Sequence, residues 1–192
     1  MSEIIPAILP KTEDQLLYQA ELMDGVAPLI HLDVLENDIW EDINNVFEVH
    51  LMISEPESVL GRWVERGAKR VVVHEISEEV LMHQHLVEIG LGVLLSTPLH
   101  EVLPLISTVD YIHLMSITEI GEQGHHFEPI IFDRIKKLSE AFPEIVIAVD
   151  GGINLENAEE LLEAGADRLI IGSAIFSTDD PEGAYADFLK LI

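Results

Sequence analysis

The stretch from 145 to 176 limits most strongly what this chain can fold into. It reads IVIAVDGGINLENAEELLEAGADRLIIGSAIF, in which two apolar, β-branched runs of strand length flank one helical segment. The first run ends in Asp-Gly-Gly at 150–152 and the second in Gly-Ser at 172–173. Consecutive glycine turns at the carboxyl ends of parallel strands can direct several backbone N–H groups at one anion. In a closed parallel barrel this corner, after the seventh and eighth strands, is the usual phosphate site.

The rest of the chain repeats this alternation of strand and helix. Strands are expected at 4–9, 28–34, 46–52, 70–74, 91–95, 110–115, 145–149 and 168–171, and helices at about 12–25, 54–67, 78–89, 99–106, 129–142, 154–165 and 181–191. Residues 36–45 are polar and too few for a helix with two loops. The pattern predicts an α/β fold, a compact (β/α)8 TIM barrel whose connection between the second and third strands is truncated. We expect residues 1–192 to form a single domain.

Three further observations limit the possible fold, binding partners and location of the chain. A doubly wound open sheet normally carries glycines in its first turn, and Leu-Pro-Lys-Thr at 9–12 contains none. The chain has 36 acidic and 10 basic residues, a formal net charge of −26, which argues against nucleic acid or anionic membranes as partners. The absence of cysteine excludes disulfides and thiolate metal sites, and it fits a cytoplasmic protein.

Four polar residues occupy positions where barrel strands end. His31 and Asp33 lie two residues apart on the second strand and therefore face the same side, while His50 and Asp150 end the third and seventh strands. Asp33 and Asp150 are expected to face each other across the barrel mouth. Two imidazoles and two carboxylates suit one divalent metal ion, such as Zn²⁺, Fe²⁺ or Mn²⁺. The alternative is four unrelated polar groups, but their shared position favours one site.

Several motifs occur in a defined order along the chain: Ile-His-Leu-Asp-Val at 30–34, Val-His-Leu-Met-Ile at 49–53, Val-Asp-Gly-Gly at 149–152 and Gly-Ser-Ala-Ile-Phe at 172–176. In this combination the chain resembles the ribulose-phosphate 3-epimerase family along nearly its whole length. The resemblance implies a metal-dependent isomerase that interconverts D-ribulose 5-phosphate and D-xylulose 5-phosphate. It also implies a homo-oligomer with a sugar phosphate as its small-molecule partner.

The resemblance assigns roles to individual residues. It implies that His31, Asp33, His50 and Asp150 hold the metal, with Asp33 and Asp150 also serving as the acid–base pair. One aspartate removes the proton next to the ketone and the other returns a proton to the opposite face, through a metal-stabilised cis-enediolate. The residues expected to bind the substrate and its phosphate are Gly121, Gly124, Gly151, Gly152, Gly172 and Ser173, and those expected to line the site are Met52, Met115 and His74.

The chain departs from the family pattern in places. Ala7 stands where the family carries a serine, His113 stands where an apolar residue is expected, and the loop at 118–127 differs while keeping Gly121 and Gly124. Epimerisation of a related ketose phosphate, such as a hexulose 6-phosphate, and a non-catalytic sugar-phosphate-binding barrel are therefore the alternatives. A decarboxylase or aldol-type enzyme of the wider group of phosphate-binding barrels is disfavoured. Those enzymes carry an Asp-x-Lys-x-x-Asp pattern, and residues 33–38 of this chain contain no lysine.

Overall fold

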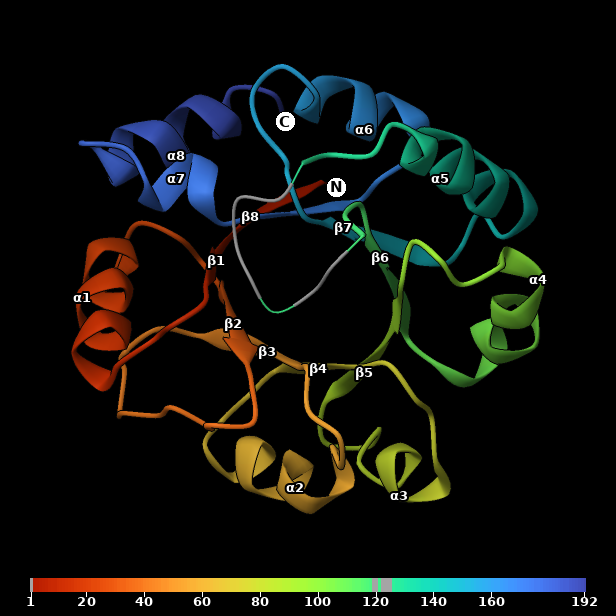
Figure 1. Cartoon of the computed structure of the whole chain (residues 1–192), viewed down its shortest axis with the longest axis horizontal. Coiled ribbons are helices and arrows are strands. Elements are labelled where there is room, and N and C mark those ends of the chain that lie inside the picture. Colours follow the sequence, from red (N-terminus) through yellow and green to blue (C-terminus); the bar gives the residue numbers. More distant parts are fainter. Residues whose placement is uncertain (1, 119–120, 122–125) are drawn as a thin grey trace.

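A computed structural model describes residues 2–118, 121 and 126–192 of the chain. Within these residues, eight parallel strands close into a barrel in sequence order (Figure 1), which confirms the predicted (β/α)8 fold. The strands are β1 (Glu3–Ile8), β2 (Ile30–Val34), β3 (Phe47–Leu51), β4 (Arg70–Val73), β5 (Glu88–Val93), β6 (Tyr111–Met115), β7 (Val146–Asp150) and β8 (Arg168–Ile171).

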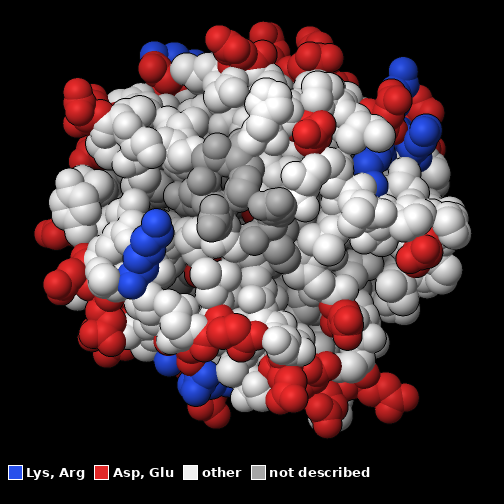
Figure 2. All heavy atoms as spheres, in the orientation of Figure 1, with Lys and Arg blue, Asp and Glu red and all other residues white. Residues whose placement is uncertain are grey.

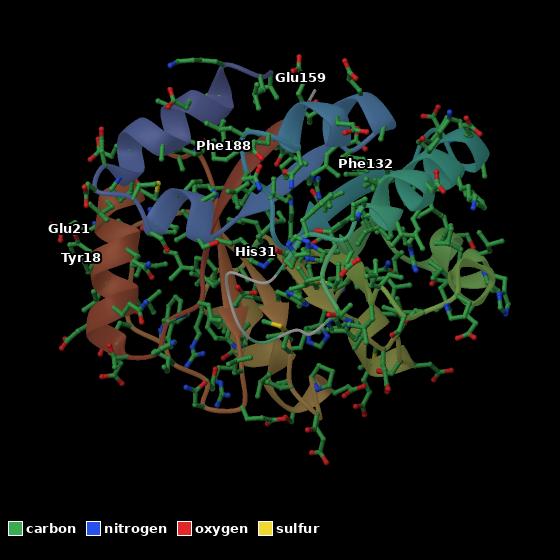
Figure 3. The ribbon with its side chains drawn as sticks, turned by 45° about the horizontal axis from the view of Figure 1, so that its top comes forward. Tyr18, Glu21, His31, Phe132, Glu159 and Phe188 are labelled. Carbon is green, nitrogen blue, oxygen red and sulfur yellow. The ribbon has the colours of Figure 1, made fainter. Side chains whose placement is uncertain are left out.

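Helices surround the ring of strands (Figure 1). They are α1 (Glu13–Met23), α2 (Glu57–Glu65), α3 (Glu78–Leu81), α4 (Leu99–Val102) continued by the 3-10 helix η1 (Leu103–Thr108), α5 (Ile130–Ala141), α6 (Ala158–Ala164), α7 (Ser173–Phe176) and α8 (Pro181–Leu189). Tyr18 and Glu21 point outward from α1, whereas Phe188 of α8 is 1% exposed and packs toward the barrel (Figure 3). Among the described residues, none of the helices combines the length and apolarity needed to cross a bilayer.

The connection between β2 and β3 contains no helix, as the sequence predicts (Figure 1). An aromatic cluster packs there instead. The ring of Trp40 lies 5.2 Å from that of Phe47 and 5.2 Å from that of Trp63, measured between centroids. The guanidinium of Arg66 lies 5.0 Å from the Trp40 ring and 4.5 Å from the Trp63 ring. These side chains provide the apolar cover that a helix provides elsewhere in the barrel.

Three predicted helices are wrong in extent. The helix expected from 154 begins at Ala158, and hydrogen bonds explain the other two differences. The helix expected at 78–89 ends at Leu81, and β5 begins already at Glu88. The Glu88 N–H donates to the Lys69 carbonyl and the Ile89 N–H donates to the Asp110 carboxylate, so both residues join the sheet. The helix expected from 54 begins at Glu57, because the Ser54 N–H and hydroxyl donate to the Glu36 carboxylate and leave no cap for a helix.

The strand faces that point into the barrel are unusually polar. TIM-barrel interiors are normally filled by branched apolar side chains. Here the described strands carry four fully buried His and Glu side chains, His31, Glu48, His50 and His113, each at most 1% exposed. The apolar core instead lies between the outer faces of the strands and the helices, where Ile112 and Leu114 of β6 belong. The polar interior therefore has a role other than hydrophobic packing.

An ion-pair network fills the amino-terminal end of the barrel below the histidines. An Arg70 Nη atom lies 2.9 Å from a Glu3 carboxylate oxygen and 3.2 Å from a Glu48 carboxylate oxygen. Arg168 pairs with Glu88 at 3.2 Å. Because burying a charge is costly unless it is paired, these partners make the charged interior tolerable.

Candidate metal and substrate site

The parallel register of the strands brings the predicted ligands together. Asp33 of β2 pairs in register with His50 of β3, and Asp150 of β7 pairs with Met115 of β6. Because side chains alternate along a strand, the inward residues of neighbouring strands lie side by side. His31 and His50 are both completely buried.

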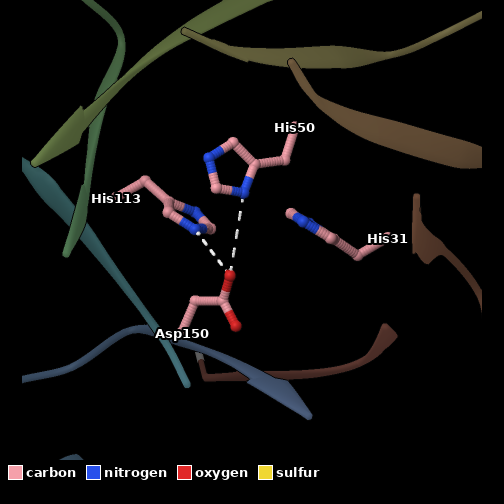
Figure 4. A group of neighbouring side chains, drawn as sticks. All are labelled: His31, His50, His113 and Asp150. Carbon is pink, nitrogen blue, oxygen red and sulfur yellow. Dashed lines mark hydrogen bonds and ion pairs between the residues drawn. The ribbon is translucent and has the colours of Figure 1, made fainter. Parts of the chain in front are cut away.

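The distances between these side chains define one centre. The Nε2 atom of His31 lies 3.4 Å from Asp33 Oδ1, and the Nδ1 atom of His50 lies 3.5 Å from the same oxygen. His50 Nδ1 also lies 3.8 Å from Asp150 Oδ2 (Figure 4). The four residues expected to share a metal ion therefore contact one another in the barrel interior.

His113 is a member of this centre that the sequence analysis left without a role. Its Nε2 atom lies 3.2 Å from Asp150 Oδ2, and its ring stacks on that of His31 with centroids 5.5 Å apart (Figure 4). His31, His50, His113 and Asp150 offer ligand atoms that all lie within 4.8 Å of one another. The sequence did indicate that His113 faces the site, because His113 precedes Met115 by two residues on one strand and therefore points to the same inward side.

Glu48 is a second functional candidate that sequence reasoning missed. Its Oε1 atom lies 2.7 Å from His31 Nδ1, and its other carboxylate oxygen lies 3.2 Å from Arg70. Glu48 precedes His50 by two residues on the same strand, so it faces the same side one layer below. The sequence did indicate this role, because Glu48 is a charged residue in a strand whose other residues, apart from His50, are apolar.

The structure places His74 behind His50. The Nε2 atoms of the two rings lie 2.8 Å apart, and His74 Nδ1 lies 3.0 Å from the carbonyl oxygen of Gly92. The absence of a side chain at Gly92 makes this position possible, because a Cβ atom there would lie 2.8 Å from Cε1 of the His74 ring. His74 thus contacts a candidate ligand directly.

Burial and hydrogen bonding move the pKa values of these groups in different directions. Burial alone lowers the pKa of His31, but the neighbouring carboxylates of Asp33 and Glu48 outweigh it and raise that pKa to about 10. Burial tends to raise the pKa of Asp33, yet the neighbouring imidazoles of His31 and His50 hold it well below the usual range. Burial lowers the pKa of His50, and it lowers that of His74 to about 4, with the nearby His50 adding to the effect. These shifts favour an ionised Asp33 beside a protonated His31. A metal cation bound there would take the place of the His31 proton that faces Asp33.

The residues present fit a divalent metal ion. Among the described residues, the buried nitrogens His31 Nε2 and His50 Nδ1 have no hydrogen-bond partner. His31 Nε2 faces the carboxylate of Asp33, and His50 Nδ1 faces those of Asp33 and Asp150. Bare imidazole nitrogens and carboxylate oxygens are donors that first-row divalent metals accept.

A pocket opens at the carboxyl ends of the strands and is lined in part by the two aspartates. Its described lining contains no Lys or Arg, so an anion there would depend on backbone N–H groups. Gly124 lies outside the described residues, and His74 is not in the lining. The predicted site residues that line the pocket are Asp33, Met52, Met115, Gly121, Asp150, Gly151, Gly152, Gly172 and Ser173.

The fold and the site define a class of protein: a (β/α)8 barrel with a candidate metal centre and a pocket at the carboxyl ends of its strands. The sequence model of the Ribulose-phosphate 3 epimerase family matches residues 3–176. The chain therefore belongs to the ribulose-phosphate 3-epimerase family, as predicted, and the predicted enzyme class, an isomerase, is that of the family.

Individual relatives agree with this assignment. The ribulose-phosphate 3-epimerase of Aquifex aeolicus is 31% identical over 183 residues, which cover 82% of this chain and 82% of that protein. The enzyme of the same name from Schizosaccharomyces pombe is 29% identical over 142 residues, covering 71% of this chain and 62% of that protein. The crystal structure of 3-hexulose-6-phosphate synthase from Salmonella typhimurium superimposes with a TM-score of 0.73 at 18% identity, covering 98% of this chain and 97% of that one. At that identity the likeness concerns the fold alone.

Proposed function

We propose that this chain is a metal-dependent 3-epimerase that interconverts D-ribulose 5-phosphate and D-xylulose 5-phosphate. The observation that carries the proposal is the placement of Asp33 and Asp150, which both line the pocket while contacting the buried imidazole of His50. Epimerisation next to a ketone requires one group to remove a proton and another to return one to the opposite face. Two carboxylates from strands on different sides of the barrel suit that requirement.

The roles of the two aspartates follow from their surroundings. Asp33 lies between His31 and His50, which favour its ionised form, so it can accept a proton from the substrate. Asp150 lies across the centre and receives a hydrogen bond from His113. The direction of turnover decides which aspartate acts as base and which as acid, since the reaction is reversible.

His31, Asp33, His50 and Asp150 would hold one divalent metal ion, with Zn²⁺, Fe²⁺ and Mn²⁺ as the candidates. A metal held there would supply Lewis-acid chemistry, in which a cation offsets negative charge that develops on the substrate oxygens. The protein supplies the geometry: buried imidazoles below the pocket and carboxylates at its floor.

The substrate phosphate would lie at the turns after β7 and β8. Gly151 has a φ of 109° and Gly152 a φ of 62°, so the backbone there turns in a way that L side chains disfavour. Gly172 and Ser173 form the adjacent turn, and Gly121 also lines the pocket. With Met52 and Met115 as apolar walls, the pocket offers one polar end for a phosphate and one for the reacting carbons.

Proton NMR of D-ribulose 5-phosphate in D₂O tests this function directly. We expect loss of the C3 proton signal and appearance of D-xylulose 5-phosphate with metal-loaded protein, and neither with chelator-treated protein or with Asp150→Asn. Asp187→Asn is the matched control, because the Asp187 carboxylate is exposed and pairs only with Lys190 among the described residues.

Absence of exchange from verified metal-loaded protein would rule out the pentulose phosphates, and hexulose 6-phosphates would be tested next. If no ketose phosphate exchanges its proton with solvent but one of them binds, the chain is a non-catalytic sugar-phosphate-binding protein. A cytoplasmic location and a homo-oligomer stay part of the proposal. Sedimentation analysis of the purified chain checks the assembly.

A further inference from the structure

An imidazole that binds a metal must present a bare nitrogen, and its second nitrogen then carries the proton. We propose that Glu48, His74 and His113 are positioning residues, each of which holds one metal ligand in the form the ion requires: His31, His50 and Asp150, respectively. The inference rests on the proposed function in one respect: it assumes that His31, His50 and Asp150 bind a divalent metal.

Glu48 determines which nitrogen of His31 is bare. The Glu48 carboxylate accepts a hydrogen bond from the N–H at His31 Nδ1 across 2.7 Å. Nε2 is therefore the nitrogen left for the metal, and it faces Asp33. Glu48 is itself held by Arg70 at 3.2 Å and is 1% exposed, so it cannot rotate away into water. A carboxylate–histidine pair of this kind also raises the basicity of the ligand nitrogen.

His74 does the same for His50 through a chain of donors and acceptors. The Gly92 carbonyl oxygen can only accept, so His74 Nδ1 donates to it across 3.0 Å. In the neutral ring His74 Nε2 is then an acceptor, and it receives the N–H of His50 Nε2 across 2.8 Å. The remaining nitrogen, His50 Nδ1, is therefore bare and lies 3.5 Å from Asp33 and 3.8 Å from Asp150.

His113 lies as close to the centre as the ligands do, but its own surroundings assign it a different role. Its Nδ1 atom is buried and has no hydrogen-bond partner among the described residues. Metal binding through Nε2 would force a proton onto Nδ1, where no described group accepts it, and an unsatisfied buried donor is unfavourable. With the proton on Nε2, His113 donates instead to Asp150 Oδ2 at 3.2 Å and orients that carboxylate (Figure 4).

The first test reads the ring protons in the unaltered protein. Nitrogen-15 NMR of the zinc-loaded chain should show a proton on Nδ1 of His31, on Nε2 of His50 and on Nε2 of His113. A zinc-loaded spectrum in which His50 is protonated on Nδ1, or in which His113 Nε2 is itself a zinc ligand, would overturn the assignment. This measurement needs no variant, so a folding defect cannot affect it.

The second test measures zinc affinity by competition with a chelator of known affinity. His74→Leu removes the acceptor for His50 and should weaken zinc binding by roughly 10–100-fold, the usual effect of losing such a partner. His74→Gln keeps a carbonyl acceptor and should recover part of the loss. Glu48→Leu, which removes the acceptor for His31, and His113→Leu should each weaken binding as well, whereas His100→Leu should not, because the His100 side chain is 79% exposed.

The outcomes separate this inference from the proposed function. Unchanged zinc affinity in folded His74→Leu and Glu48→Leu would overturn the inference even if the wild-type protein epimerises its substrate. The expected ring protons and affinities, without any epimerisation of ketose phosphates, would leave the inference intact and reject the proposed function.

Discussion

Each histidine inside the barrel differs from the others in what its second nitrogen contacts. His31 contacts a carboxylate, His50 contacts another imidazole, and the Nδ1 atom of His113 has no partner among the described residues. At the scale of single residues, this difference is the basis on which we propose that His31 and His50 bind the metal while His113 donates to Asp150. Residue type alone does not distinguish them.

Gly92→Ala tests how closely the ring of His74 is held. A Cβ atom would lie 2.8 Å from His74 Cε1, so the ring must shift from the position in which it contacts His50. We expect a loss of stability of about 1–3 kcal/mol from overpacking, together with weaker zinc binding. Urea unfolding and chelator competition measure the two effects.

Gly61→Ala is the matched control for that substitution. Gly61 lies in α2, and a Cβ atom added there would have its nearest neighbour 3.7 Å away, which is ordinary contact. Alanine should therefore stabilise the helix by about 0.5–1 kcal/mol and leave zinc binding unchanged. Equal effects of the two alanines on zinc binding would contradict the role given to Gly92.

At the scale of elements, the connection between β2 and β3 shows how the barrel remains covered without a helix. Trp40 comes from that connection, Phe47 begins β3, and Trp63 and Arg66 come from α2 and its end. Residues 36–45 were predictable as too short for a helix. Their aromatic contact with α2 depends on how that helix packs, which the local sequence does not contain.

Trp40→Ala should lower the free energy of unfolding by about 3 kcal/mol, because it removes an aromatic side chain that packs on two rings and a guanidinium. Urea unfolding followed by circular dichroism measures the loss. Leu86→Ala serves as control, since Leu86 is 60% exposed and should change stability by less than about 0.5 kcal/mol. A similarly small loss for Trp40→Ala would show that the cluster is not a structural substitute for a helix.

At the scale of the whole molecule, charge is divided between the surface and the interior. The net charge is −26, and acidic side chains outnumber basic ones on the face drawn in Figure 2. In Figure 3, Glu21 and Glu159 both point outward from the helices, away from His31 inside the barrel. The interior charges are paired, whereas the surface carboxylates mostly repel one another.

This division predicts how stability depends on salt. Raising sodium chloride from about 10 mM to about 150 mM shortens the screening length from about 30 Å to about 8 Å. Repulsion between surface carboxylates then weakens, while the buried pairs are screened much less. We expect the free energy of unfolding to rise over this range, with sucrose at equal osmolality as the control. A fall in stability would indicate that attractive surface pairs dominate.

The sequence by itself determined the barrel and most of the site. Strand length, glycine turns and the alternation of side chains are local properties, so they predict eight βα units and the shared face of His31 and Asp33. The same local rules fail at Glu88 and Ser54, where contacts with Lys69, Asp110 and Glu36 override them.

The tertiary structure alone decided which side chains hold one another. The pairs His31–Glu48, His50–His74 and His113–Asp150 join residues separated by 17, 24 and 37 positions in sequence. Their contact depends on the register between strands and on the closure of the barrel. No local pattern specifies either, because both result from packing the whole chain around one polar interior.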